Sequence, residues 1–143
     1  MNDLETAKTL LNQKQLTLVI VKNGITLYET RFHRISGFLD AIDQHGKALQ
    51  NASVADKVVG KAVALLCALA EVTEVYAETL STAGRTILEQ KGISHEWKTL
   101  VDTILDDKKL DLCPFEKEAA KMDDPRIAYE RFKVLQKNMR ACK

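Results

Sequence analysis

The fold is decided by residues 16–30, which read LTLVIVKNGITLYET. Up to Lys22 nearly every residue is apolar or β-branched, and after Gly24 apolar and polar residues alternate. Both patterns are typical of β-strands. Between them, Asn23-Gly24 supplies the two residues with positive φ that a type I′ turn requires. The stretch therefore predicts a β-hairpin whose first strand is buried.

Helical periodicity flanks the hairpin on both sides. Before it, Asn2 can cap a helix with Glu5 at the third helical position, and the apolar face of this helix consists of Leu4, Ala7, Leu10 and Leu11. After it, Ser36 is expected to cap a short helix that Gly46 can end. A long helix is then expected from Ser53 to about Ala70.

Strands and helices alternate in the second half. The pattern predicts a strand over residues 74–80, a helix from Ser81 or Thr82 to Gly92, and a strand through Ile93, His95 and Trp97. A short element over residues 100–105 is also expected, and helices begin at Cys113-Pro114 and at Asp124-Pro125, because proline is favoured in the first turn.

This order of elements predicts an α/β fold, a three-layer α/β/α sandwich with a mixed sheet. No stretch rich in proline, glycine or serine divides the chain. We therefore expect a single domain over residues 1–143, with an N-terminal helix over 1–13, a core over 16–130, and a C-terminal helix end with a basic tail over 131–143.

Composition limits the classes of partner. The 143 residues are 45% hydrophobic and 29% charged, with a formal net charge of +1, as in an ordinary globular domain. This charge gives no general attraction to nucleic acid or membranes, so neither is expected as a partner. The longest apolar run, residues 62–70, is much shorter than the roughly 20 residues that span a bilayer. Three cysteines without C-x-x-C spacing favour a cytoplasmic location.

The first candidate motif is residues 53–61, SVADKVVGK, at the start of the expected long helix. Its charged and small residues would share one helix face, and free backbone N–H groups at a helix start favour an anion. We therefore expect this face to bind a ligand through Ser53, Asp56, Lys57 and Lys61, with Gly60 leaving space. The alternative is that Ser53 and Asp56 only form a capping box and that the lysines are solvated.

The second candidate motif is residues 112–117, LCPFEK. Cys113 stands at a helix start, where a thiolate is favoured, and Glu116 one turn later can act as a base or a cap. The alternative, which we favour for this residue, is a small buried cysteine, since no histidine is near in sequence to activate it. His33, His45 and His95 are scattered singly, without the spacing of a metal site. Cys67 is expected in the core and Cys142 in an exposed tail.

The element order resembles the cytidine-deaminase-like fold. More closely, residues 52–62, 74–77 and 112–117 resemble a small uncharacterised bacterial and archaeal family with that fold, over about residues 16–129. Deaminases carry a His or Cys, any residue and Glu at the start of one helix, and Pro-Cys-x-x-Cys at the start of the next. By this resemblance the ligand positions fall on Val54, Ser81 and Gly84, and the acid/base position falls on Asp56.

Valine, serine and glycine cannot replace the His and Cys ligands of zinc. The resemblance therefore implies the fold and the place of the pocket, and it argues against a zinc-dependent deaminase. We expect no metal and no other cofactor.

Three functions remain open. The leading hypothesis is binding of a polar or anionic, nucleotide-like small molecule where the helix starts at Ser53, at Ser81 and Thr82, and at Cys113 converge. The second is a metal-independent enzyme that uses Cys113 or Asp56. The third is an interaction or structural module with a vestigial pocket. Whether the chain forms a homo-oligomer is left open.

Overall fold

The computed structural model describes residues 2–32, 35–105 and 111–141, so His33 and Cys142 lie outside the described residues. The helices are α1 (Asp3–Gln13), α2 (Ser36–His45), α3 (Lys61–Ala70), α4 (Thr82–Gln90), α5 (Pro114–Ala119) and α6 (Pro125–Ala141), with a 3₁₀ turn η1 (Gly46–Leu49). The strands are β1 (Leu18–Lys22), β2 (Ile25–Thr30), β3 (Ser53–Val59), β4 (Glu74–Ser81) and β5 (Ser94–Val101).

The predicted hairpin is confirmed. β1 and β2 pair antiparallel, and Asn23 and Gly24 have φ values of 53° and 77°, as a type I′ turn requires. The carboxylate of Asp3 accepts both backbone N–H groups of the turn, at 2.8 Å from Asn23 N and 2.9 Å from Gly24 N. The start of α1 therefore holds the turn. The Asn2 cap is confirmed as well, because Asn2 Oδ1 accepts the N–H of Glu5 at 2.8 Å.

The long helix from Ser53 is wrong in its first half, because residues Ser53–Val59 form strand β3. This strand lies in the middle of the sheet, antiparallel to β1 and parallel to β4. Its valines repeat at positions that also suit one helix face, but β-branched residues favour a strand flanked on both sides. Gly60, in an extended conformation, separates the strand from α3, which begins at Lys61.

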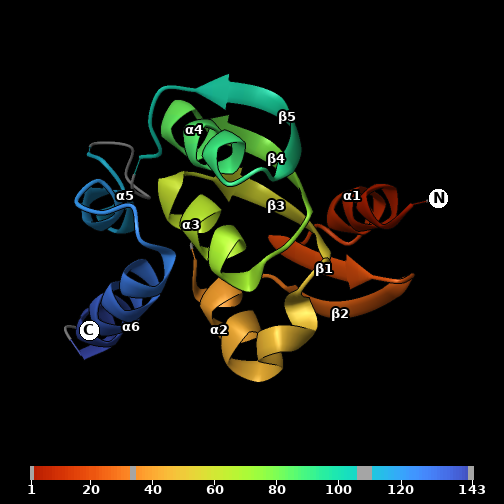
Figure 1. The fold of residues 1–143 in the computed structure, drawn as a ribbon, viewed down its shortest axis with the longest axis horizontal. Helices are drawn as coiled ribbons and strands as arrows, with labels where there is room; N and C mark the ends of the chain where they lie inside the picture. Colours follow the sequence, from red (N-terminus) through yellow and green to blue (C-terminus); the bar gives the residue numbers. More distant parts are fainter. Residues whose placement is uncertain (1, 33–34, 106–110, 142–143) are drawn as a thin grey trace.

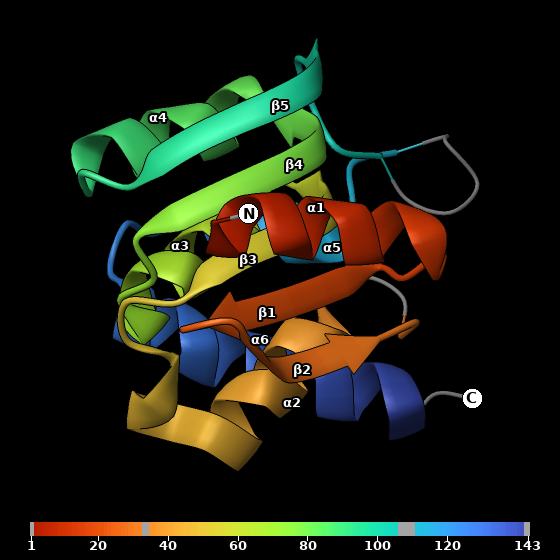
Figure 2. The ribbon, with the colours of Figure 1, turned by 90° about the vertical axis from the view of Figure 1, so that its right-hand side faces the viewer.

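One mixed sheet in the order β2-β1-β3-β4-β5 forms the middle layer. Figure 2 shows α1 in front of the sheet and the other helices behind it. Leu4, Ala7 and Leu11 of α1 pack against the side of the sheet that carries Ala55 and Tyr76. The larger core lies on the opposite side, where α2, α3 and α4 cover the strands and α5 and α6 pack next to α3 (Figure 1). The predicted three-layer α/β/α sandwich with a mixed sheet is confirmed.

The second half follows the predicted order. Ser81 caps α4 by accepting the N–H of Gly84 at 3.0 Å, and β5 lies parallel to β4 at the edge of the sheet. The element expected over residues 100–105 is the end of β5 followed by an isolated bridge between Leu105 and Leu112. Within the described residues, no helix is long and apolar enough to cross a membrane.

Candidate functional site

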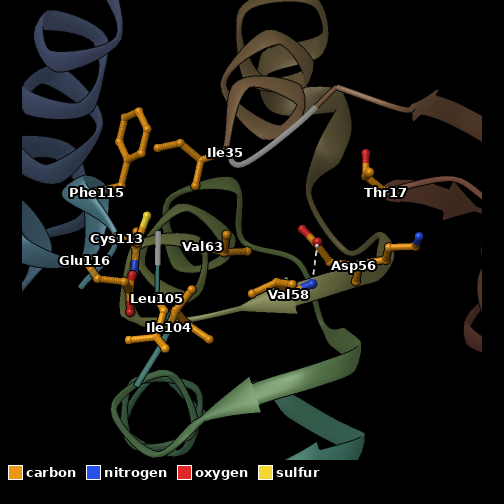
Figure 3. A pocket seen from close by; sticks show the side chains of 13 residues that line it. Thr17, Ile35, Asp56, Val58, Val63, Ile104, Leu105, Cys113, Phe115 and Glu116 are labelled. Carbon is orange, nitrogen blue, oxygen red and sulfur yellow. Dashed lines mark hydrogen bonds between the residues drawn. The ribbon is translucent and has the colours of Figure 1, made fainter. Parts of the chain in front are cut away.

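A pocket of about 290 Å³ lies where β3 ends, between the start of α3, the segment after β5 and the start of α5 (Figure 3). Its walls are mostly apolar and include two acidic side chains and one thiol. The lining residues are Thr17, Ile35, Asp56, Lys57, Val58, Gly60, Ala62, Val63, Ile104, Leu105, Cys113, Phe115 and Glu116. Side-chain alternation along β3 turns Asp56 toward the face that α3 covers.

Glu116 is bound to the start of α3. Its Oε1 accepts the N–H of Lys61 and its Oε2 accepts the N–H of Ala62, each at 2.8 Å. The carboxyl group is buried, and burial raises its pKa although these two N–H groups lower it. The helix start that the sequence analysis placed at Ser53 and assigned to an anionic ligand lies at Lys61, and Glu116 occupies it as a cap supplied by a distant helix.

Asp56 lies in the opposite wall from Cys113 and Glu116 (Figure 3). Its side chain is 8% exposed, and its Oδ1 accepts the N–H of Val58 at 3.1 Å. Burial raises its pKa from 3.8 to about 7, against the lowering effect of the backbone N–H groups of Val58 and Lys57. Among the described residues, no lysine, arginine or histidine forms an ion pair with it. Asp56 is therefore a carboxyl group poised to gain or lose a proton near neutral pH.

Cys113 precedes α5 and lines the pocket with little exposure. Its backbone N–H donates to the carbonyl oxygen of Ile104 at 2.9 Å, which ties the start of α5 to the segment after β5. The short helix from Cys113-Pro114 is confirmed by α5. Cys67, on α3, is fully buried as expected, and burial followed by the nearby charge of Asp56 raises the pKa of its thiol.

The two lysines do not place ammonium groups together in this pocket. Lys57 follows Asp56 on β3, so its side chain points to the other face of the sheet; the effect of Lys57 on Asp56 comes through its backbone N–H. Lys61 Nζ lies 2.9 Å from Asp123 Oδ1, and Lys61 is absent from the pocket wall. The expectation that Lys57 and Lys61 share one helix face is wrong, because Lys57 belongs to a strand.

Three further predicted site residues lie outside the pocket. Ser53 is at the far end of β3, where its Oγ donates to Glu74 Oε1 at 3.1 Å. The Ser81 side chain is buried and caps α4. Thr82 Oγ1 donates to the carbonyl oxygen of Asp102 at 3.2 Å. The structure therefore brings together the side chains of Asp56, Cys113 and Glu116, with Lys57 beside them at the pocket, and it leaves Ser53, Lys61, Ser81 and Thr82 outside the pocket wall.

Sequence reasoning missed the apolar part of the wall. Ile35, Val63, Ile104, Leu105 and Phe115 come from four separate regions of the chain, and only Phe115 lies within a candidate motif, where it was given no role. Val58 and Leu105 are more than 40% exposed, which is unusual for large apolar side chains beside a pocket. Only their positions in the folded chain identify them.

The comparisons with known proteins agree with this architecture. Residues 6–137 match the family model described as TM1506, a domain of unknown function (DUF1893). The chain belongs to this family. No curated protein matches the chain. The crystal structure of a DUF1893 protein, TM1506 from Thermotoga maritima, is 25% identical, with a TM-score of 0.84 over 95% of this chain and 90% of that one.

The DUF1893 chain also resembles deaminase-like structures. RibD from Acinetobacter baumannii gives a TM-score of 0.52 at 19% identity, over 85% of this chain and 36% of that one. A dCMP deaminase from the cyanophage S-TIM5 gives a TM-score of 0.49 at 19% identity, over 66% of this chain and 93% of that one. The family match confirms the predicted family, and the likeness to RibD confirms the deaminase-like fold; at 19% identity that likeness concerns the fold alone.

The placement of the first deaminase motif on Val54 and Asp56 is wrong, because both residues lie within β3. The helix start is formed by Gly60, Lys61 and Ala62, which include no His or Cys. At the start of α4, Ser81 Oγ already accepts the N–H of Gly84, and Gly84 has no side chain that could bind a metal. The Glu116 carboxylate already fills the space next to Gly60. These residues do not fit the zinc of a deaminase.

Elsewhere in the described part of the chain, no cluster of side chains replaces this set of zinc ligands. Over residues 2–32, 35–105 and 111–141, no group of three or more His, Cys, Asp or Glu side chains could hold a metal ion.

Proposed function

We propose that the pocket between β3, α3 and α5 binds a small organic molecule that has an apolar body and a nitrogen-bound hydrogen directed at Asp56. The observation that carries this proposal is the buried carboxyl group of Asp56 in an apolar wall, without a cationic partner among the described residues. Burial of a carboxylate costs free energy unless it is paired. A ligand that donates a hydrogen bond or brings positive charge would offset that cost.

The apolar side chains that line the pocket are the reason for proposing a ligand with an apolar body. Ile35, Val63, Ile104 and Phe115 offer dispersion contacts, and Val58 and Leu105 add exposed apolar surface. A pocket of about 290 Å³ is at the small end of ligand pockets, which typically measure about 300–1,000 Å³. An amidine or a heteroaromatic amine of one or two rings suits this size and chemistry.

The charges do not favour an anionic, nucleotide-like ligand. Glu116 accepts the two N–H groups at the start of α3, and Lys61 pairs with Asp123. A phosphate group near the pocket would meet Asp56 and Glu116. Phosphate-bearing compounds therefore form the comparison arm of the experiment.

The test is a thermal-shift and calorimetric screen with benzamidine, cytosine and adenine against inorganic phosphate and AMP. A compound that binds only the folded chain raises its Tm in proportion to the logarithm of its excess over Kd. We expect at least one of the three nitrogen bases to raise the Tm of the wild type, and Asp56→Asn to weaken this effect. Glu118→Gln, outside the pocket wall, is the matched control. A response to phosphate and AMP alone would contradict the proposal.

A second candidate is a metal-independent enzyme in which Asp56 moves a proton. A pKa of about 7 favours it, because a general acid or base works best when its pKa is near the working pH. Cys113 lies across the pocket from Asp56, so a bound molecule would contact both walls (Figure 3). If this candidate is correct, Asp56→Asn removes turnover of a compound that still binds, whereas a pure binding protein shows no turnover in either form.

A further inference from the structure

The outer edge of the sheet presents a strand without a described neighbour. β5 is the last strand in the order β2-β1-β3-β4-β5, and among the described residues it pairs only along its inner edge, with β4. Six of its eight residues are exposed, including Trp97 at 36% and Leu100 at 38%. Free backbone N–H and C=O groups on such an edge are a template for another strand.

The two faces of β5 differ in chemistry. His95 and Trp97 stack on one face, with ring centroids 6.0 Å apart, and the Arg85 guanidinium lies 4.8 Å from the Trp97 centroid. Glu96 and Lys98 alternate with them and so point to the other face. Glu96 makes only a 3.4 Å contact with Lys8, and Lys98 has no ion pair within the described part of the chain.

We propose that β5 pairs antiparallel with β5 of a second copy of this chain, with Trp97 of both copies on the two-fold axis. This register places Glu96 of each copy opposite Lys98 of the other, on one face. On the other face it places Trp97 opposite Trp97 and His95 opposite Thr99. Opposite charges and aromatic pairs stabilise directly opposed positions of antiparallel strands.

Charge complementarity selects a second copy over an unrelated strand. Charged residues on an edge strand usually keep other strands away, since they meet uncompensated or like charges. In β5 the negative and positive charges stand at equal distances on either side of Trp97. The same sequence in the opposite direction therefore satisfies both, whereas a parallel, in-register copy would oppose like charges. The two-fold contact is closed, so it ends at a dimer and joins the two sheets into one.

Charge reversal tests this register. We expect wild-type protein to sediment as a concentration-dependent dimer. Lys98→Glu leaves two acidic residues on each copy and Glu96→Lys leaves two basic ones, so each variant alone should dissociate with a Kd raised about tenfold or more. An equimolar mixture of the two variants, and the double variant E96K/K98E, should both dimerise again. Lys121→Glu, a charge reversal on another surface, should leave Kd unchanged.

Oxidative cross-linking gives a second readout of the register in a background with Cys142→Ser. Trp97→Cys places thiols on the two-fold axis, at a separation that a disulfide can span, whereas Thr99→Cys places them opposite His95 and out of reach. We expect a covalent dimer from the first variant and not from the second. The proposal is overturned if the wild type stays monomeric, if Lys98→Glu dimerises as well as the wild type, or if mixing the two reversed variants restores no dimer.

Discussion

Glu116 and Gly60 share one space: a Cβ at residue 60 would lie 2.2 Å from Glu116 Oε1 and 2.5 Å from its carboxyl carbon. The glycine is therefore required by a close approach, because its φ of −104° is accessible to any residue. The approach allows the carboxylate to accept the N–H groups of Lys61 and Ala62, which begin α3. This contact fixes α5 against the sheet edge where the pocket lies.

The first prediction concerns Gly60→Ala. The added methyl group must displace the buried Glu116 carboxylate from two backbone donors, so we expect a loss of about 2–3 kcal/mol in the free energy of unfolding. Chemical denaturation measures it. In a Glu116→Ala background the same substitution should cost less than about 1 kcal/mol, since the clash is gone. Equal costs in both backgrounds would show that the two residues are not coupled.

The second prediction distinguishes the contribution of the Glu116 hydrogen bonds to stability from that of its negative charge. Glu116→Gln keeps one acceptor oxygen but turns an amide N–H₂ toward a backbone donor, so we expect a loss of about 1–2 kcal/mol in the free energy of unfolding. Glu116→Ala leaves both N–H groups without this acceptor and should cost more. Glu118→Gln, on the same helix, should change stability by less than about 0.5 kcal/mol. Urea denaturation of the three variants gives the order, and an unchanged Glu116→Ala protein would rule out the cap.

Turn chemistry made the hairpin predictable. Asn23-Gly24 is a local signal, and both φ values follow from it. Residues 53–59 lacked such a signal, because valines at positions 54, 58 and 59 fit one helix face as well as a buried strand. Periodicity alone does not separate a short buried strand from the start of a helix. Gly60 marks the boundary between β3 and α3, whereas the sequence analysis placed it inside one helix, where it would leave space for a ligand.

The sequence identified both motifs of the candidate site but placed their meeting point at Ser53, at the wrong end of β3. Both motifs do reach one pocket, but Cys113 and Glu116 approach the start of α3 at Lys61, and Ser53 lies at the other end of β3. The bond between Glu116 and Lys61 joins residues 55 positions apart. Contacts at such separations are set by the packing of whole elements, and the same holds for the apolar wall.

The third prediction follows from the pKa of Asp56. Burial raises it from 3.8 to about 7, so the folded state holds this proton more tightly than the unfolded state. The stability that Asp56 contributes is therefore complete below about pH 4 and is lost as the pH rises through 7, by up to about 4 kcal/mol. Relative to the wild type, Asp56→Asn should become progressively more stable between pH 4 and pH 8, as measured by denaturation at several pH values.

Asp123→Asn is a control of opposite sign for the Asp56 experiment. The hydrogen bond and charge of Lys61 lower the pKa of Asp123, so its contribution is present at neutral pH and is lost as the pH falls. This variant should be less stable than the wild type at neutral pH and should approach it in acid. An Asp56→Asn protein with the same pH dependence as the wild type would show that Asp56 ionises as in the unfolded chain.

The last prediction is that ligand affinity at the pocket depends on the ionisation of Asp56. Benzamidine keeps its positive charge between pH 5 and pH 8, so its pairing with Asp56 depends only on how much of the carboxyl group is ionised. We expect its affinity to rise about tenfold per pH unit below the pKa of Asp56 and to level off above about 7, as measured by calorimetry. In Asp56→Asn the affinity should be low and independent of pH, whereas Glu118→Gln should follow the wild type. A benzamidine affinity that falls as the pH rises through 7 would contradict this prediction, because the protonated form of Asp56 would then be the form that binds.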